Sequence, residues 1–534
     1  MQKKFSTDVW NYRICNDGTA AIINYKGEDT KVIIPSEING SIVAKIGDTV
    51  FRDKRDIVAV TIPNTIRIID DNAFGDCHDL TDLIIPENVE EIDSSAFHDC
   101  AGLADENGFV IFRNVLYGYY GDAETVTVPK GIETIGYRCF ADNKIIKEII
   151  LPDSVYKIEF GAFLKCKKLQ KVNIPNSVKE ISNKAFYGCQ CLSNLVIPET
   201  VVKIGKEVFS GCSSLADENG FICIRSVLYD YLGNAETVIV SHGIEIIGDC
   251  CFENNENIKT VILPDSVSII GHMAFFYCSN LQRIEMSDTV KEIGNVAFCG
   301  CKNLACLTIP ETAEIIGFSA FGRCAGLADE NGFVIVRNVL YGYFGDSKTV
   351  KVPHGIEIIG DFCFPPHTNI VKIILPDSVH KIGCRAFSMS FDLECVEISN
   401  AECEIGNEAF SSCEKLTNLI MPETVKVIGD RAFRDCPGLA DENGYVIFQD
   451  VLHDYFGDAE IVTIPPGIKT IGSFCFFERN KIKAVIIPDS VEKIGSFAFF
   501  FCDDLQRAEI YNDECEIDDF AFLSSTSLIF KDKG

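Results

Sequence analysis

The sequence predicts a curved β-rich solenoid, an elongated array of stacked coils, and three observations support this fold class. The chain has 534 residues, more than one compact core holds, so it forms either several domains or a repeat array. The pattern Ala-Phe-x-x-Cys recurs along the chain, as in AFGDC from Ala73 and AFYGC from Ala185. Its phenylalanine recurs every 23 residues, apart from four steps of 43 residues. Self-similarity at a period of this length is the sequence signature of a solenoid.

The four long steps define a higher period. Three ordinary units and one unit with 20 extra residues make a super-repeat of 112 residues. The extra segments are near copies of one another, and we number the super-repeats one to four from the residues at which they begin, Ala104, Ala216, Ala328 and Ala440. The register phenylalanines are Phe51, Phe74, Phe97, Phe140, Phe163, Phe186, Phe209, Phe252, Phe275, Phe298, Phe321, Phe364, Phe387, Phe410, Phe433, Phe476, Phe499 and Phe522.

A single unit shows why the coil forms. The unit that starts at Leu169 has the sequence LQKVNIPNSVKEISNKAFYGC. Its first apolar residues lie on a short strand that ends at Pro175, because proline cannot donate to a sheet ladder. Phe186 fills the interior and Ala185 allows close approach of the chain. One unit cannot bury its apolar side alone, but stacked units form a continuous core with strands about 4.8 Å apart.

The repeated pattern Leu-x-x-Val/Ile-x-Ile-Pro-x-x-Val-x-x-Ile-Gly-x-x-Ala-Phe-x-x-Cys resembles the BspA-like class of leucine-rich repeat. It runs from about Ile57 to Leu528, nearly the whole chain. The resemblance implies a leucine-rich repeat solenoid, a β-rich curved arc with a parallel β-sheet on the concave side. It also implies roles in adhesion or protein binding, often at a cell surface. Only structural positions carry over, because the motif of the family names no catalytic group.

The ends of the chain differ from its middle. Residues 1–40 lack the phenylalanine register, and the segment YRICNDGTAAIINYKG alternates around Asn16-Asp17-Gly18, which indicates a hairpin. We therefore expect a β-type cap over residues 1–40 and the solenoid over 41–534. The sequence stops hardly one strand after Phe522, so we expect fraying there or pairing with another molecule.

The inserts contain two β-prone runs. In super-repeat one these runs flank Arg113-Asn114, which predicts either a hairpin or a shortened coil. The preceding segment, residues 105–108, reads Asp-Glu-Asn-Gly and predicts a polar turn. A calcium loop is the alternative, since Asp and Asn oxygens are suitable ligands. An EF-hand loop would need a longer run of ligands and a distal glutamate, which this stretch lacks.

Aromatic pairs in the inserts are the first candidate contact residues. Their members alternate along the strand, so we expect both to lie on one side of it. If that side faces the core, the rings close a modified coil. If it faces outward, Tyr119, Tyr231, Tyr343 and Tyr455 form four aromatic stations for a long or repetitive partner. The pairs are Tyr117 with Tyr119, Tyr229 with Tyr231, Tyr341 with Tyr343, and His453 with Tyr455.

Four isoleucines are the second set of candidates. Each lies between the two inward positions of a strand and should point outward by the period-two rule. Ile150, Ile262, Ile374 and Ile486 occupy this place at steps of 112 residues. They form either an apolar contact ladder on the sheet or simply reflect the strand preference of β-branched residues.

The 25 cysteines follow the repeat. Many stand three residues after the register phenylalanine, which indicates small buried hydrophobic side chains in each turn. Disulfide rungs between coils are the alternative, because equivalent α-carbons of stacked strands lie close enough for a bridge. A zinc site is not expected, since pairs such as Cys189 with Cys191 lack a second matched pair.

Catalytic, cofactor and membrane signals are not found in the sequence. The 8 histidines are scattered, and there is no phosphate-binding or dinucleotide-binding glycine motif in its proper setting. The formal charge of −30 opposes binding to nucleic acid or anionic membranes. No secretory h-region and no long apolar run is present, so we expect no membrane insertion and favour the cytoplasm.

These observations predict a non-enzymatic, monomeric protein-interaction or adhesion scaffold without a cofactor. Its partner protein would bind on the concave sheet or on the insert aromatics. Two alternatives stay open. One is a carbohydrate or peptidoglycan binder that uses the insert aromatics, and the other is a structural spacer without a specific ligand.

Overall fold

The structure, a computed structural model, describes residues 4–364, 366, 369–422, 425–518, 520–522 and 527–531. The chain divides into two compact units, which we describe separately. Unit 1 comprises Met1–Asn234 with Ile246–Cys251, and unit 2 comprises Ala235–Glu245 with Phe252–Gly534. Each unit is a β-solenoid of stacked parallel strands, so the predicted fold class is confirmed.

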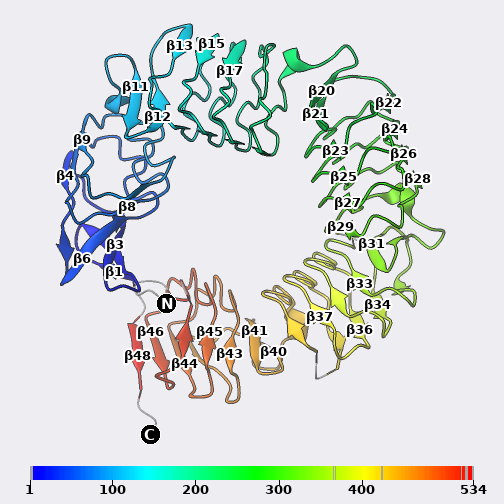
Figure 1. Cartoon of the computed structure of the whole chain (residues 1–534). Helices are drawn as coiled ribbons and strands as arrows, with labels where there is room; N and C mark the ends of the chain where they lie inside the picture. Colours follow the sequence, from blue (N-terminus) through cyan, green and yellow to red (C-terminus); the bar gives the residue numbers. More distant parts are fainter. Residues whose placement is uncertain are drawn as a thin grey trace. The chain divides into compact units, whose positions relative to one another are not determined.

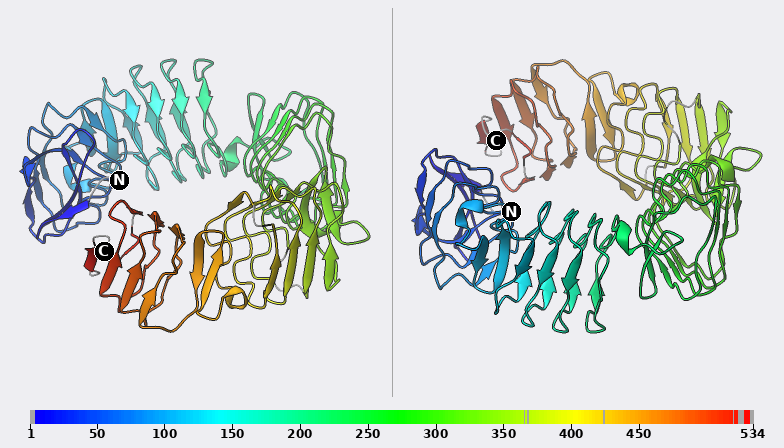
Figure 2. Two further views of the ribbon diagram at one scale, coloured as in Figure 1. Left: turned by 90° about the horizontal axis from the view of Figure 1, so that it is seen from below. Right: turned by 90° about the horizontal axis from the view of Figure 1, so that it is seen from above.

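Each ordinary coil contributes one strand before the repeat proline to a sheet that we call the long-strand sheet. Each strand pairs in parallel with the strand of the next repeat, and paired residues are 23 positions apart in the sequence. Val126, Ile149 and Val172 align in this way in three successive turns. Their central residues point inward, and the proline ends each strand. Figure 1 shows β13, β15 and β17 stacked in unit 1, and Figure 2 shows these turns from below and above.

The long-strand sheets end at every insert. The strands are, in unit 1, β4 (Lys31–Ile33), β7 (Ala59–Thr61), β9 (Asp82–Ile84), β13 (Thr125–Thr127), β15 (Glu148–Ile150) and β17 (Lys171–Asn173). In unit 2 they are β22 (Thr237–Ile239), β24 (Thr260–Ile262), β26 (Arg283–Glu285), β28 (Cys306–Leu307), β32 (Thr349–Lys351), β34 (Lys372–Leu375), β36 (Cys395–Ile398), β38 (Asn418–Ile420), β42 (Ile461–Thr463), β44 (Ala484–Ile487), β46 (Arg507–Ile510) and β48 (Ser527–Phe530).

A second strand, immediately before the Gly of the repeat, forms what we call the short-strand sheet. The coil therefore carries two parallel sheets, one on each side of the buried core. The strands in unit 1 are β6 (Ser41–Ile46), β8 (Ile68–Ile69), β10 (Glu91–Ile92), β14 (Thr134–Ile135), β16 (Lys157–Ile158), β18 (Glu180–Ile181), β19 (Lys203–Ile204) and β23 (Ile246–Ile247). Those in unit 2 are β25 (Ile269–Ile270), β27 (Glu292–Ile293), β29 (Ile315–Ile316), β33 (Ile358–Ile359), β35 (Lys381–Ile382), β37 (Glu404–Ile405), β39 (Val427–Ile428), β43 (Thr470–Ile471), β45 (Lys493–Ile494) and β47 (Glu516–Ile517).

The register phenylalanines stack into a ladder at the third side of the coil. Neighbouring rings lie nearly parallel, with centroids 4.7 to 5.9 Å apart within each run of ordinary coils. The backbone N–H of Phe163 donates to the carbonyl of Ala185 in the next turn at 2.8 Å, and other turns repeat this bond. Stacking and hydrogen bonding at one position explain why this residue keeps the register.

The inserts are antiparallel hairpins, which confirms the hairpin alternative. Each follows a single 3-10 turn, and its second strand continues in parallel into the short-strand sheet, as β12 does with β14. The 3-10 turns are η1 (Ala101–Leu103), η2 (Ser213–Leu215), η3 (Ala325–Leu327) and η4 (Pro437–Leu439). The hairpins are β11 (Phe109–Phe112) with β12 (Val115–Tyr119), β20 (Phe221–Ile224) with β21 (Val227–Tyr231), β30 (Phe333–Val336) with β31 (Val339–Tyr343), and β40 (Tyr445–Phe448) with β41 (Val451–Tyr455).

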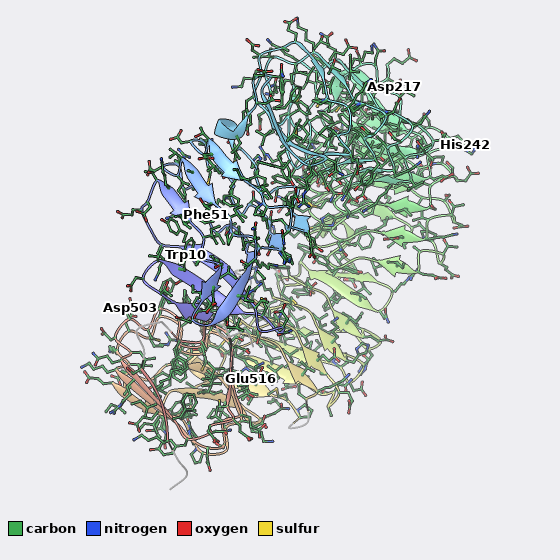
Figure 3. All side chains as sticks on the ribbon, turned by 60° about the vertical axis from the view of Figure 1, so that its left-hand side comes forward. Trp10, Phe51, Asp217, His242, Asp503 and Glu516 are labelled. Carbon is green, nitrogen blue, oxygen red and sulfur yellow. The ribbon has the colours of Figure 1, made fainter. Side chains whose placement is uncertain are left out.

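The N-terminal segment has the same design as an insert. The strands β1 (Lys4–Ser6), β2 (Trp10–Ile14) and β3 (Ala20–Tyr25) are antiparallel, β3 then pairs in parallel with β6, and β5 (Glu37–Ile38) pairs with β6. Trp10 packs on Phe51 with ring centroids 6.1 Å apart, and both lie in the first turns (Figure 3). The strand β4 already belongs to the parallel long-strand sheet, so stacking begins before residue 41.

Candidate functional site

The four candidate isoleucines lie on the outer face of the long-strand sheets. Ile150 is 39% exposed, whereas Ile262, Ile374 and Ile486 are half-buried. Each inward neighbour on the same strand, such as Ile149 beside Ile150, is buried. The alternation therefore places these side chains as the sequence predicts, one in each super-repeat.

Polar residues flank the isoleucines in the neighbouring turns. Thr127 and Asn173 lie in register beside Ile150. In the following turn, the residue in register with each of the other three isoleucines is a glutamate that forms an ion pair. These pairs are Glu285 with Arg283 at 3.0 Å, Glu397 with Lys372 at 2.5 Å, and Glu509 with Arg507 at 3.4 Å. Each isoleucine therefore has a polar residue in register on at least one side, and Ile262 also has the exposed Ile239 in register in the preceding turn.

Exposed aliphatic side chains of these sheets lie on strands beside the inserts. Ile84 is 78% exposed, and Ile239 and Ile420 are also exposed. The alternation predicts their outward direction, but not their exposure. That exposure arises because the sheet ends at the insert and leaves no neighbouring strand on one side.

The insert aromatics are core residues, so the core alternative holds and the four tyrosines are not outward contact residues. Tyr119, Tyr231, Tyr343 and Tyr455 are only 2 to 7% exposed, and their partners Tyr117, Tyr229, Tyr341 and His453 are also buried. The rings continue the phenylalanine ladder across the insert. Tyr117 meets Phe97 with centroids 5.2 Å apart, and Tyr119 meets Phe140 at 5.7 Å.

The two members of a pair do not lie on one side of the strand, which corrects an expectation from the sequence. The register of the hairpin shifts between Val110 and Ile111, and Tyr117 is the residue left without a partner. A β-bulge of this kind reverses the alternation. Tyr117 therefore packs into the preceding core and Tyr119 into the following one. This insert closes one core and opens the next.

A glycine makes room for each of these tyrosines. A Cβ atom on Gly121 would lie 2.6 Å from Cζ of Tyr119, and Gly345 stands in the same relation to Tyr343. The motif Tyr-x-Gly recurs at the same place in all four inserts, and Tyr25 with Gly27 repeats it in the N-terminal segment. The motif is therefore explained by packing.

The polar segment before each hairpin is a turn. In super-repeat one, Oδ1 of Asp105 accepts hydrogen bonds from the backbone N–H groups of Asn107 and Phe109, both at 2.9 Å. The other three copies form the same two bonds. The aspartate side chain thus serves the backbone, as the polar-turn interpretation requires.

The repeat cysteines are buried thiols. None of the 25 cysteines forms a disulfide, and eleven of them donate to the carbonyl oxygen of the phenylalanine 26 residues earlier, with Sγ–O distances of 2.9 to 3.2 Å. Burial raises the pKa of Cys77 to about 12. These thiols are poor nucleophiles and serve packing.

One group in the described ranges has the composition of a metal site. Ligand atoms of Asp76, His78 and Asp99 lie within 4.8 Å of one another. Nε2 of His78 is 4.0 Å from Oδ2 of Asp99, and Arg52 pairs with Asp76 at 3.4 Å. These three residues could hold a divalent cation, but the Arg52 guanidinium already balances part of their charge.

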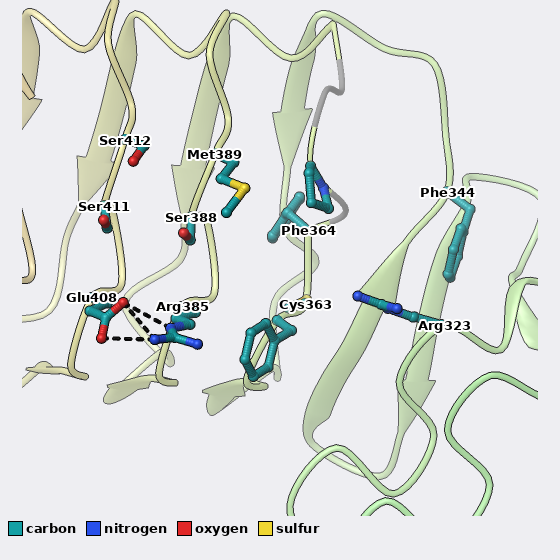
Figure 4. A pocket seen from close by; sticks show the side chains of 12 residues that line it. Arg323, Phe344, Cys363, Phe364, Arg385, Ser388, Met389, Glu408, Ser411 and Ser412 are labelled. Carbon is teal, nitrogen blue, oxygen red and sulfur yellow. Dashed lines mark hydrogen bonds and ion pairs between the residues drawn. The ribbon is translucent and has the colours of Figure 1, made fainter. Parts of the chain in front are cut away.

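A pocket of about 300 Å³ lies in super-repeat three (Figure 4). Arg385 donates two hydrogen bonds of 2.9 Å to Glu408, and Phe344, Phe362 and Met389 contribute apolar surface. Its thiol, Cys363, is buried, and burial raises its pKa well above the ordinary value. The thiol is therefore a poor nucleophile, and the pocket offers mixed polar and apolar contact surface.

An outward cluster of six phenylalanines lies on the turns of super-repeat four. We call it the outer aromatic cluster. Two of its rings, Phe474 and Phe497, stack with centroids 4.9 Å apart, and Phe497 stacks on Phe520 at 5.3 Å. This cluster was not predicted from the sequence, although the runs SFCFF and SFAFFF contain the signal. The members are Phe474, Phe477, Phe497, Phe500, Phe501 and Phe520.

Comparison with solved structures finds bacterial leucine-rich repeat proteins. A leucine-rich repeat protein from Bacteroides ovatus is 23% identical over 80% of this chain and 97% of its own, with a TM-score of 0.29. A leucine rich cell surface protein from Faecalibacterium prausnitzii is 19% identical over 97% and 95%, with a TM-score of 0.27. The T. pallidum leucine rich repeat protein is 29% identical over 40% and 92%, with a TM-score of 0.26. No curated protein matches the chain.

The sequence also matches a family model. The model is described as a BspA type leucine rich repeat region, and it matches residues 30–107, 111–219, 222–348, 334–458 and 446–530. This repeat indicates a non-enzymatic scaffold. The helices of the described ranges are single three-residue turns, and none has the length or apolar character to cross a bilayer. The chain belongs to the BspA-type leucine-rich repeat family.

Proposed function

We propose that this protein is a non-enzymatic scaffold that binds a partner protein along the outer face of its long-strand sheets. The observation that carries the proposal is the outward isoleucine in each super-repeat, Ile150, Ile262, Ile374 and Ile486. These side chains occupy equivalent places 112 residues apart. A partner that is long or repetitive could contact several of them at once.

The strength of such binding would come from linkage. A single half-buried isoleucine offers little apolar area, so one contact is weak. Contacts on one chain add through effective concentration, and the combined affinity can exceed each one by orders of magnitude. The charged neighbours, such as Glu285 and Glu397, would set the register of the partner and suppress wrong ones.

The experiment replaces the four isoleucines by threonine, which keeps the β-branched shape and the strand preference. Thr127 already occupies this row of the sheet beside Ile150. The matched control replaces the exposed side chains Val202, Ile315 and Val427, which lie in or next to strands of the short-strand sheets, by threonine. Both variants should melt within a few degrees of the wild type, because surface substitutions are usually worth about 0.5 kcal/mol or less.

Wild type and both variants are immobilised and exposed to one protein mixture, and the retained proteins are quantified. Proteins kept by the wild type and the control but lost by the fourfold variant support the proposal. Equal retention by all three baits contradicts it. A parallel glycan array tests the carbohydrate alternative, which no longer has the buried insert tyrosines as its contact residues. Binding to neither proteins nor glycans would favour the structural spacer.

A further inference from the structure

The outer aromatic cluster already accepts guanidinium groups from its own chain. Cζ of Arg431 lies 3.3 Å from the ring centroid of Phe474. Arg434 lies over Phe477 at 5.1 Å. Both distances are within the range of a cation–π interaction, in which the negative face of the ring attracts the cation. The cluster thus shows which chemical group its rings bind.

The opposite side of the cluster is open to solvent. Phe501 and Phe520 are 46% and 54% exposed, and Phe500 is half-buried. In the part of the chain that the structure describes, no lysine or arginine lies over the rings of Phe500 and Phe501. These rings therefore keep aromatic surface for a cation from outside.

The backbone gives no reason for phenylalanine at three of these positions. Phe474, Phe497 and Phe520 have φ of 61°, 58° and 59°, in the left-handed region that bulky residues rarely adopt. Equivalent positions in other turns carry polar residues such as Lys184 and Glu207 at similar φ. The aromatic side chains are therefore explained by their exposure and stacking rather than by local conformation.

The surroundings of the cluster are acidic. Residues 470–522 contain eleven acidic and five basic residues, a net charge of −6. Glu478, Asp503 and Asp504 are exposed and stand within three residues of Phe477 or Phe501. Figure 3 shows Asp503 on the outer side of these turns. The acidic surface attracts cationic partners and repels anionic ones.

We propose that the outer aromatic cluster binds an arginine-rich segment of a partner protein. Guanidinium groups of that segment stack on Phe500 and Phe501, and Asp503 and Asp504 pair with further cationic groups. Arginine fits better than lysine, because its planar and weakly hydrated guanidinium stacks on aromatic faces. This surface is separate from the isoleucine rows, so it extends the proposed function.

The test measures binding of labelled peptides to the full chain by fluorescence anisotropy at physiological salt. The probe is a twelve-residue peptide with four arginines spaced by glycine and serine. Two matched peptides carry lysine or neutral citrulline in place of arginine. The arginine peptide should bind several-fold more tightly than the lysine peptide, and the citrulline peptide should not bind.

The variant Phe500→Ser/Phe501→Ser should bind the arginine peptide about tenfold more weakly, since an exposed cation–π contact contributes a few-fold to affinity at each ring. The matched control is Phe318→Ser, an exposed phenylalanine in super-repeat two, which should bind like the wild type. The fourfold isoleucine variant should also bind this peptide normally. Failure of the isoleucine proposal is thereby distinguished from failure of this one.

Three results would overturn the proposal. The first is equal binding of the arginine, lysine and citrulline peptides by the wild type, a comparison that needs no variant. The second is unchanged affinity of the double variant, with folding verified by its melting temperature. The third is tighter binding to phosphatidylcholine vesicles than to the arginine peptide, which would assign the cluster to a membrane surface.

Discussion

Replacing His453 by tyrosine should change how the stability of super-repeat four depends on pH. His453 is buried, its ring lies 5.5 Å from that of Phe433, and its Nε2 atom has no hydrogen-bond partner among the described residues. Burial lowers the pKa of His453 from 6.5 to about 4. Tyrosine occupies the equivalent position in the other three inserts, as Tyr117 does.

The sign follows from linkage. The imidazole is neutral in the folded chain, and the unfolded chain takes up its proton first as the pH falls. The contribution of His453 is therefore fully present above pH 6.5 and is lost as the pH falls towards 4. The difference between the two pKa values corresponds to about 3 kcal/mol of unfolding free energy.

The neighbouring Asp454 acts in the opposite direction. Its carboxyl is buried and pairs with Arg479 at 3.2 Å. Burial raises the pKa of Asp454 from 3.8 to about 6. Its contribution is therefore present below pH 3.8 and is lost as the pH rises through about 6. This is again about 3 kcal/mol, so the two effects largely cancel in the wild type between pH 4 and 6.

Single variants should reveal the two slopes. Hydrogen exchange of the full chain, corrected for the intrinsic rate, gives the opening free energy of β40 and β41 between pH 4.5 and 6.5. In His453→Tyr it should fall as the pH rises, because only Asp454 remains. In Asp454→Gly, which restores the glycine found at Gly118, it should rise with pH. Parallel pH profiles for the wild type and both variants would refute this reasoning.

Three further predictions concern packing. Gly121→Ala should lower stability by about 1–3 kcal/mol, because its Cβ would overlap with Tyr119; an unchanged urea midpoint would contradict the Tyr-x-Gly explanation. Ser390→Cys should raise it by about 1 kcal/mol, since the buried Ser390 hydroxyl has no partner among the described residues where other turns place a bonded thiol; a lower melting temperature would argue against this. The exposed Cys191, Cys306 and Cys384 should react first with a thiol reagent, and buried thiols such as Cys77 only after denaturation; rapid titration of all 25 in the native state would show that the burial is wrong.

The sequence by itself determined the features that depend on local chemistry and on repetition. A proline that cannot donate to a ladder ends each long strand, as Pro175 does after β17. The register phenylalanine predicted the stacked core, because identical side chains at identical places meet when units stack. The β-prone runs around Arg113-Asn114 predicted the hairpin, and the strand alternation placed Ile150 on the outer face.

Only the tertiary structure decided where the insert aromatics lie. Strand alternation predicted that Tyr117 and Tyr119 share a side, but one bulge at Tyr117 sends the two rings into different cores. Nothing local distinguishes that register from a regular hairpin, because the bulge depends on packing against Phe97 and Phe140 in other coils. The outer aromatic cluster has the same origin. Its three successive turns are 23 residues apart in the sequence, and only their stacking joins Phe474, Phe497 and Phe520 into one surface.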